Sequence, residues 1–261
     1  MTAPDGDRPP GTHASVPRET PPAAATAVFG DRLPLAVAYA ELLATEGTIR
    51  GLIGPREAAR VWERHLLNCA VVADILPANA AVADIGAGAG LPGLVLAVRR
   101  PDLRVTLVEP LLRRARFLEE AVARLDLENA VVRRARAEDL PGELTFDCVT
   151  SRAVAPLPRL LDWCLPLVRE GGVMVAMKGG TAQDEVLAAA VELTRWGSPR
   201  VEVLELGGAA IDPPTTVVRV HVEARTVLRW SRQTPSARRA ASPRRGKKRG
   251  GRRRDHPGPG T

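Results

Sequence analysis

The sequence predicts an α/β fold, in which a mostly parallel sheet is covered by the helices that connect its strands. From residue 80 onward, short β-branched runs alternate with stretches of helical periodicity, which is the pattern of strands joined by crossover helices. A glycine-rich segment at residues 84–93 follows the first run and opens the first helical stretch. With 261 residues, of which 45% are hydrophobic, the chain can bury the core of one such domain with extensions at its ends.

Seven runs in this region are predicted as strands, and four longer stretches between them as helices. The strands are expected at residues 81–85, 105–108, 130–132, 146–150, 172–177, 201–206 and 216–222. The helices are expected at residues 94–99, 112–125, 157–167 and 183–194. No helical stretch separates the last two strands, so we expect a terminal hairpin that gives the sheet an antiparallel edge strand.

A helical extension is predicted before the sheet, over residues 28–79. Apolar side chains recur there at helical spacing, first at residues 35–43 and then over residues 55–75, where one face carries Val61, His65, Leu66, Cys69 and Val72. We interpret His65 as a packed, hydrogen-bonded side chain, with a general base as the alternative. Residues 1–27 lack periodic apolar positions and are predicted to be disordered.

The two ends of the chain differ strongly in charge. Residues 225–261 hold 13 of the 37 Lys and Arg residues and one of the 30 Asp and Glu residues, a net charge of +12, which leaves −5 for residues 1–224. Like charges at this density repel and keep a segment unfolded, so a basic disordered tail is expected after a domain at residues 80–224.

Several classes of protein are disfavoured by composition. Charge interrupts every apolar run well before the roughly 18 residues of a membrane span. The N-terminus lacks the basic start and apolar centre of an export signal, so we expect a cytoplasmic protein without a membrane partner. Cys69, Cys148 and Cys164 lie in apolar contexts without metal-ligand spacing, which indicates buried thiols and no metal site.

The glycine-rich segment is the most specific local feature. Residues 84–93 read Asp-Ile-Gly-Ala-Gly-Ala-Gly-Leu-Pro-Gly, and glycines between a strand and a helix let a ligand approach the backbone. A dinucleotide site would have a third glycine at Leu91, so the pattern disfavours NAD. Glu109 ends the second predicted strand, where an acid can accept hydrogen bonds from ribose hydroxyls. The arrangement resembles class I methyltransferases, which have a Rossmann-like fold and use S-adenosyl-L-methionine.

Further segments resemble one family of these enzymes, the RsmG or GidB family, over roughly residues 60–190. The matching segments are Arg64-His65-Leu66-Leu67-Asn68, the glycine loop, Arg116-Phe117-Leu118, Leu127-Glu128-Asn129, Ser151-Arg152-Ala153 and Met177-Lys178-Gly179. Members of that family methylate N7 of a guanine in the decoding region of 16S ribosomal RNA. The resemblance therefore implies this RNA, free or in the 30S subunit, as partner, with no DNA; we expect a monomer.

By the same resemblance, seven residues are expected to bind the cofactor, and no catalytic residue is assigned. They are Gly86, Gly88, Leu91, Glu109, Ala137, Glu138 and Arg152. Ala137, Glu138 and Arg152 follow predicted strands, at the edge where open α/β sheets bind ligands. Lys178, also at a strand end, is either a solvated residue or a phosphate or substrate contact. The sequence departs from the family pattern at Asn68, where an aspartate is common.

The chemistry that the sequence lacks also narrows the reaction. None of the three cysteines follows a proline, as the nucleophile of cytosine C5 methylation commonly does. Asp212-Pro213-Pro214-Thr215 resembles an amino-methylation motif, but it lacks the aromatic residue and is interpreted as a turn between the last two strands. Guanine N7 needs no base, because its lone pair is already free. Two alternatives stay open: a small-molecule or protein methyltransferase, and a non-catalytic ribosome-associated factor that binds the cofactor.

Overall fold

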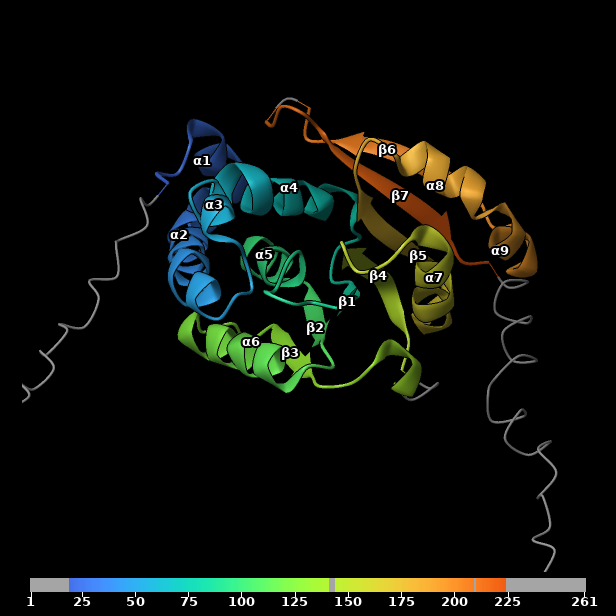
Figure 1. Cartoon of the computed structure of the whole chain (residues 1–261), viewed down its shortest axis with the longest axis horizontal. Coiled ribbons are helices and arrows are strands. Elements are labelled where there is room, and N and C mark those ends of the chain that lie inside the picture. Colours follow the sequence, from blue (N-terminus) through green and yellow to red (C-terminus); the bar gives the residue numbers. More distant parts are fainter. Residues whose placement is uncertain (1–18, 141–143, 209, 224–261) are drawn as a thin grey trace, which may run out of the picture.

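The computed structural model describes residues 19–140, 144–208 and 210–223. A seven-stranded, mostly parallel sheet crosses it, with helices on both faces (Figure 1), so the predicted fold class is confirmed. The strand order is β3-β2-β1-β4-β5-β7-β6. The strands are β1 (Ala81–Ile85), β2 (Arg104–Val108), β3 (Ala130–Arg133), β4 (Phe146–Arg152), β5 (Val168–Lys178), β6 (Val201–Leu206) and β7 (Thr215–His221).

Two groups of helices cover the two faces of the sheet, and Figure 1 shows the blue to green group and the olive to orange group on opposite sides. The first group is α1 (Ala23–Phe29), α2 (Leu33–Leu42), α3 (Pro55–Ala58), α4 (Leu67–Ala70), α5 (Gly93–Arg99) and α6 (Leu112–Arg124). The second is α7 (Leu157–Cys164), α8 (Ala182–Ala188) and α9 (Ala190–Arg195). No helix of the described residues is long and apolar enough to span a membrane.

The alternation of side chains along the strands separates two apolar layers. Val82 of β1 and Cys148 of β4 pack with the N-terminal helices and α5, whereas Ala83 and Val149, one position later, pack with α7. All four side chains are completely buried. Both faces of the central strands are therefore covered, which explains their continuous apolar character.

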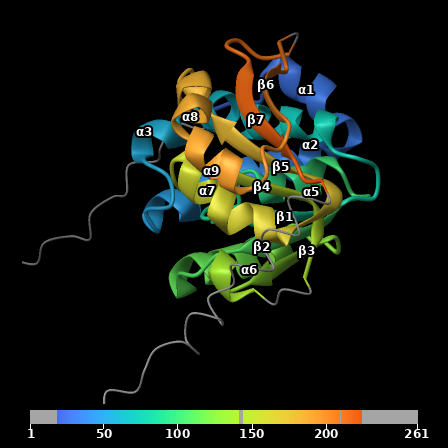
Figure 2. The same ribbon diagram turned by 90° about the vertical axis from the view of Figure 1, so that its right-hand side faces the viewer.

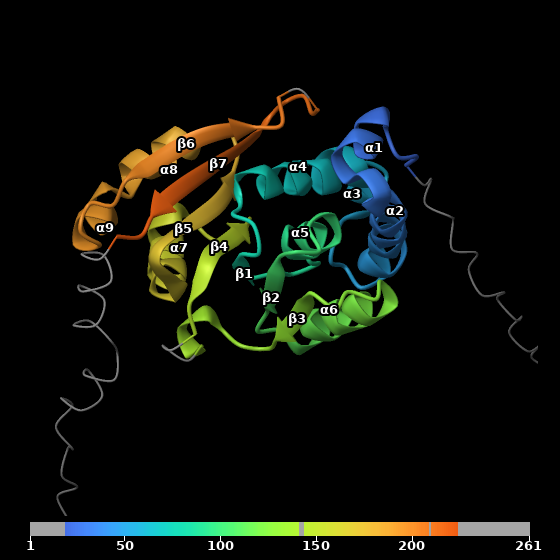
Figure 3. The same ribbon diagram turned by 180° about the vertical axis from the view of Figure 1, so that it is seen from behind.

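The end of the sheet differs from the sequence prediction in one respect. A terminal hairpin forms, but its antiparallel strand β7 lies between β5 and β6, so the edge strand is β6 and the prediction of an antiparallel edge strand is wrong. Figures 2 and 3 show β6 and β3 at opposite ends of the sheet. The physical reason is burial: Val217, Val218 and Val220 of β7 are fully buried, whereas Glu202 and Glu205 suit the partly exposed β6.

The N-terminal region also needs a correction. The range predicted to be disordered, residues 1–27, contains most of helix α1, which buries Ala25 and packs Phe29 edge-to-face on Trp62 with ring centroids 6.0 Å apart. The helix predicted over residues 55–75 is interrupted. After α3 the backbone passes through a π-helical turn, α4 and a 3₁₀ turn that ends at Ile75. Residues 1–18 and 224–261, including the predicted basic tail, lie outside the described residues.

Candidate cofactor-binding site

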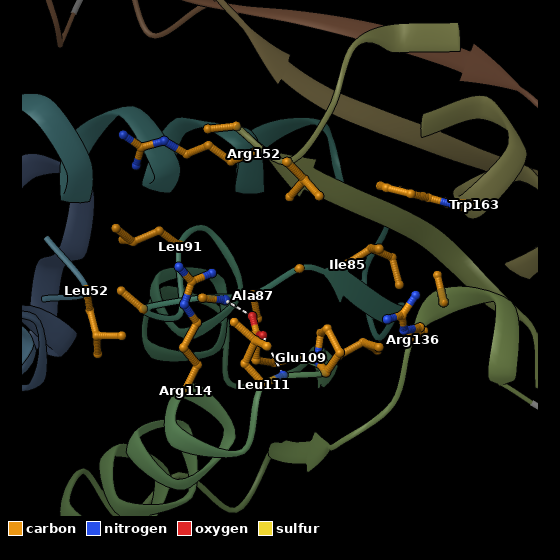
Figure 4. A pocket seen from close by; sticks show the side chains of 18 of the residues that line it. Leu52, Ile85, Ala87, Leu91, Glu109, Leu111, Arg114, Arg136, Arg152 and Trp163 are labelled. Carbon is orange, nitrogen blue, oxygen red and sulfur yellow. Dashed lines mark hydrogen bonds between the residues drawn. The ribbon is translucent and has the colours of Figure 1, made fainter. Parts of the chain in front are cut away.

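A pocket of about 570 Å³ opens where β1, β2, β3 and β4 end. This is the carboxyl edge of the sheet, because these four strands run parallel. Figure 4 shows side chains from each of these strand ends, and from the N-terminal helical region, around one space. All seven residues that the sequence predicted for the cofactor line it: Gly86, Gly88, Leu91, Glu109, Ala137, Glu138 and Arg152. That they bind the cofactor stays a prediction.

The glycine loop follows β1 and has left-handed backbone at three of its glycines. The φ angles of Gly86, Gly88 and Gly90 are 71°, 57° and 95°, a region that side chains with a Cβ disfavour. A Cβ on Gly86 would also lie 2.6 Å from Cγ2 of Val154, which lines the pocket. The absence of a side chain at Gly86 therefore leaves the pocket floor open and lets Val154, in the loop after β4, pack against it.

The fourth glycine of the loop is needed for a different reason. The N–H of Gly93, the first residue of α5, donates to Oδ2 of the fully buried Asp84, 2.8 Å away, and a Cβ there would lie 2.7 Å from the same oxygen. Burial raises the pKa of Asp84 to about 7. Asp84 Oδ1 has no hydrogen-bond partner among the described residues. The Asp84 side chain thus connects the end of the glycine loop to β1 through this hydrogen bond.

Glu109 lies at the end of β2, on the floor of the pocket. Its Oε2 accepts a hydrogen bond from the Gly88 N–H at 3.0 Å, and its Oε1 accepts one from the Leu111 N–H at 2.9 Å (Figure 4). Two backbone donors therefore fix the carboxylate, and only 2% of the residue is exposed. Each oxygen keeps a lone pair for a further donor, which suits a ligand with two adjacent hydroxyl groups.

The segment after β3 forms another wall of the pocket. Ala137–Asp139 is a 3₁₀ turn, in which Ala137 is buried and Glu138 is exposed. Arg136 on this segment and Trp163 of α7 also line the pocket, at the side of Ile85 (Figure 4). Neither Arg136 nor Trp163 was predicted from the sequence, because nothing local marks them as pocket residues.

Arg152, at the end of β4, connects the sheet to the N-terminal region. Its Nη2 donates to the Arg64 carbonyl at 3.1 Å and lies 2.7 Å from His65 Nδ1, and its Nη1 lies 3.3 Å from Cys69 Sγ. None of these partners is a carboxylate, so Arg152 brings a cation to the pocket. The next residue, Ala153, has φ 54°, which is strained for alanine and turns the chain beside Gly86.

The contact with Arg152 determines the state of His65. A guanidinium can only donate, so His65 Nδ1 accepts and the imidazole proton lies on Nε2. Burial lowers the pKa of His65 to about 4, and the positive charge of Arg152 lowers it further from its ordinary value. The ring is thus neutral, 5% exposed and weakly basic. The burial and the Nδ1 contact agree with the packed, hydrogen-bonded interpretation, but Nε2 has no hydrogen-bond partner among the described residues, and His65 also lines the pocket.

The N-terminal region supplies contacts that the sequence analysis did not assign. Leu52, Ile53 and Glu57 line the pocket. The hydroxyl of Tyr39 on α2 is completely buried and donates to the Ala89 carbonyl of the glycine loop at 2.7 Å. A signal was present, because the single tyrosine of the chain lies among apolar helix residues and a buried hydroxyl needs a partner.

Lys178 lies beside the site and does not line the pocket. Its ammonium donates to Glu185 Oε2 at 2.7 Å and to the Ala155 carbonyl at 3.0 Å, and 9% of its side chain is exposed. Of the two alternatives for Lys178, the solvated strand-end residue is wrong, because Glu185 of α8 pairs with its ammonium. Lys178 therefore holds the segment that follows β4, and a phosphate or substrate contact stays a prediction.

The cysteines are buried free thiols, as the sequence predicted. Burial raises the pKa of Cys148 to about 12 and also raises the pKa of Cys69, although Arg152 opposes the shift at Cys69. The described residues contain no group of three or more His, Cys, Asp or Glu side chains that could hold a metal ion.

Comparison with known proteins identifies the family. The family model for GidB, rRNA small subunit methyltransferase G, matches residues 32–209. The chain belongs to the GidB family. A ribosomal RNA small subunit methyltransferase G of Salinispora tropica is 53% identical over 94% of this chain and 100% of its own length. One of Thermobifida fusca is 53% identical over 88% and 96%. The family resemblance seen in the sequence is confirmed.

The fold of this GidB family member is also found in a solved structure. A putative S-adenosyl-L-methionine-dependent methyltransferase of Methanococcus maripaludis has a TM-score of 0.51 at 12% identity, with 61% of this chain and 85% of that chain covered. At this identity the likeness concerns the fold alone, and it agrees with a class I methyltransferase sheet.

The cofactor of the family, S-adenosyl-L-methionine, fits the residues that are present. Glu109 keeps acceptor capacity for both ribose hydroxyls, and Gly86 and Gly88 leave backbone uncovered in the pocket floor. By the family resemblance, Ala137 and Glu138 would flank the adenine, and Arg152 would lie beside the cofactor. When bound, the cofactor would supply an electrophilic methyl group on a sulfonium, with S-adenosylhomocysteine as the leaving group.

Proposed function

We propose that this chain methylates N7 of a guanine in 16S ribosomal RNA. Membership in the GidB family carries the proposal, since close relatives that span the chain are named as small-subunit ribosomal RNA methyltransferases. The pocket supplies the second support, because it combines the glycine loop with Glu109, a carboxylate that keeps acceptor capacity for two hydroxyl groups. The chain would act as a monomer in the cytoplasm, on free 16S RNA or on the 30S subunit.

The polar groups of the pocket suit an acceptor that needs no deprotonation. His65 is the side chain there that most resembles a general base, but its Nδ1 is engaged by Arg152 and its pKa is lowered to about 4. Guanine N7 has a free lone pair in the plane of the ring, so no proton has to leave before attack. Positioning alone then supplies the catalysis, for which effective molarities of about 10⁵ to 10⁸ M are known in model reactions.

The remaining residues of the site act by binding and orientation. Glu109 would hold the ribose and thereby set the depth of the cofactor in the pocket. Arg152, held by His65 and the Arg64 carbonyl, would orient the groups at the end of β4, where the acceptor base must enter. Ala153 and Val154 shape the opening there, because both line the pocket and are exposed.

Transfer of radiolabel tests the proposal directly. S-adenosyl-L-methionine with a tritiated methyl group is incubated with the chain and purified 30S subunits, free 16S RNA, or a pool of metabolites and proteins. We expect label in the ribosomal RNA, at a guanosine that digestion identifies as 7-methylguanosine. Label only in the metabolite or protein pool, or cofactor binding without any transfer, would contradict the proposal.

A further inference from the structure

Six arginines gather beside the pocket, where β2 and β3 end. Three lie in the first turns of α6, directly after the segment that follows Glu109, and three lie at the end of β3 and just beyond it. Val108 of β2 is paired with Arg133 of β3, so both groups lie at the same edge of the sheet. This arginine rim consists of Arg113, Arg114, Arg116, Arg133, Arg134 and Arg136.

The rim continues into the pocket. Arg114 and Arg136 line it, one on each side of Glu109 (Figure 4). The other four rim arginines are exposed and lie outside the pocket lining. A ligand that enters the pocket therefore passes guanidinium groups that are continuous with those on the outer surface.

The rim arginines form no ion pairs among the described residues, whereas several arginines elsewhere in the fold do. Among the described residues, no rim guanidinium forms an ion pair or a side-chain hydrogen bond. Arg99, Arg100 and Arg219, by comparison, each contact a carboxylate at 2.7 Å. The rim segments contain four acids, Glu119, Glu120, Glu138 and Asp139, and Glu120 is paired with Arg50 at 2.6 Å. Clustered like charges without partners cost free energy in the isolated protein, and a polyanion removes that cost.

We propose that the arginine rim is the surface on which the ribosomal RNA docks through its phosphates. The inference rests on the proposed function and adds the position of the RNA on the protein surface. An RNA that places a base in the pocket must leave its backbone outside, across the pocket opening. Guanidinium groups bind phosphates through paired hydrogen bonds, which gives the backbone a fixed position without reading its sequence.

The rim can be distinguished from the basic tail by its position. The tail adds charge to every variant equally, whereas the rim occupies one edge of the sheet. The chain also offers a matched control on the same elements: Arg104 begins β2 and Arg124 ends α6, so both lie at the opposite edge, and both are exposed. Removing either pair changes the net charge by the same amount.

Three double variants of the full chain test the inference. Arg133→Gln/Arg134→Gln and Arg113→Gln/Arg116→Gln remove rim charges outside the pocket, and Arg104→Gln/Arg124→Gln is the control. Affinity for 30S subunits and for 16S RNA is measured over a series of KCl concentrations. Each lost phosphate contact should reduce the slope of log affinity against log salt by about 0.7 to 0.9, and two lost contacts should weaken binding about tenfold near physiological salt.

The control variant is expected to bind RNA like the unmodified chain, and all three variants should keep their affinity for S-adenosylhomocysteine. Rim variants that bind RNA as tightly as the control, or a control that loses as much affinity as they do, would overturn the docking surface. Formation of 7-methylguanosine by the unmodified chain is followed in the same subunits. Rim-dependent binding without methylation would overturn the proposed function and leave the docking surface in place.

Discussion

The two edges of the sheet are built from the same strands but differ in how several of their charged groups are paired. At the amino edge, Arg100 pairs with Asp102, and Arg169 pairs with Asp147, whose other oxygen accepts the Ala81 N–H. At the carboxyl edge, Asp84 is buried with one oxygen free, and the arginine rim has no carboxylate partner among the described residues.

The difference indicates that polar groups at the amino edge contribute mainly to stability, and those at the carboxyl edge mainly to ligand binding. Polar groups that satisfy one another at the amino edge contribute to folding and have little capacity for a ligand. Groups at the carboxyl edge keep unused hydrogen-bonding capacity, which costs free energy until a ligand is bound. Variants placed in pairs, one at each edge, can therefore separate the two roles.

The largest difference is expected between Gly86→Val and Gly171→Val. Both positions have left-handed φ, 71° and 77°, so both substitutions should destabilise the fold by about 1 to 3 kcal/mol through backbone strain. Only Gly86 has a neighbour at 2.6 Å, whereas nothing lies within 4 Å of a Cβ on Gly171. Calorimetry should find no cofactor binding for Gly86→Val and normal binding for Gly171→Val. Undiminished affinity in a folded Gly86→Val protein would remove the glycine loop from the site.

A smaller effect is expected from the arginines at the two edges. Arg152→Ala should reduce the single-turnover rate with saturating RNA about a hundredfold, because the end of β4 loses its connection to the N-terminal region. Arg100→Ala should leave that rate unchanged and lower the melting temperature, since Arg100 bonds Asp102 and the Ala73 carbonyl.

His65→Ala belongs to the same experiment and should retain substantial turnover, because His65 acts by holding Arg152. A folded His65→Ala protein without any turnover would favour a general base, and with it a substrate that must lose a proton.

The aspartates at the two edges should give opposite dependences of stability on pH. The pKa of Asp84 is raised to about 7, so the folded state retains a proton that the unfolded state loses near pH 4. The contribution of Asp84 to the unfolding free energy is therefore largest below pH 4 and is lost as the pH rises to about 7. The pKa of Asp102 is well below its usual range, through hydrogen bonds from Arg100 and the Asn79 N–H, so its stabilisation is present above pH 4 and is lost on acidification.

Denaturant unfolding between pH 3 and 8 checks this pair. Relative to Asp84→Asn, the unmodified chain should lose on the order of 4 kcal/mol of unfolding free energy between pH 4 and 7. Relative to Asp102→Asn, it should change only below pH 4. The lowered pKa of His65 makes the unfolding free energy rise with pH between about 4 and 6.5, opposite to the effect of Asp84. This contribution is the same in the unmodified chain and in each variant, so it cancels in the comparison. A pH-independent difference for Asp84→Asn would show that burial does not raise the pKa of Asp84 in the folded state.

The smallest effect is expected from the basic tail, which lies outside the described residues. A chain that ends at Arg232 loses 10 of the 13 basic residues of the tail. It should keep cofactor binding and methylate the same guanine at the same rate with saturating RNA. Its affinity for 30S subunits should fall about tenfold with a shallower salt dependence. Unchanged affinity and salt dependence would mean that the tail is not an RNA-binding element.

The strands and the glycine loop could be predicted because their signals are local. β-Branched runs such as residues 81–85 specify strands by themselves, and an acid two residues before GxGxG specifies the turn after the first strand. All seven predicted cofactor residues line one pocket for the same reason, since the carboxyl ends of parallel strands meet at one edge. The chain by itself thus determined the fold class, the family and the edge that carries the site.

Only the tertiary structure decided which distant residues meet there. The contacts of Arg152 with His65 and of Tyr39 with Ala89 span 87 and 50 residues, and no spacing in the sequence encodes them. The same holds for the position of β7 inside the sheet and for the helix at Ala23, whose apolar side chains are buried only because Trp62 and its neighbours lie opposite. Packing between elements depends on shape and burial across the whole core, and these are properties of the folded chain that a local pattern does not contain.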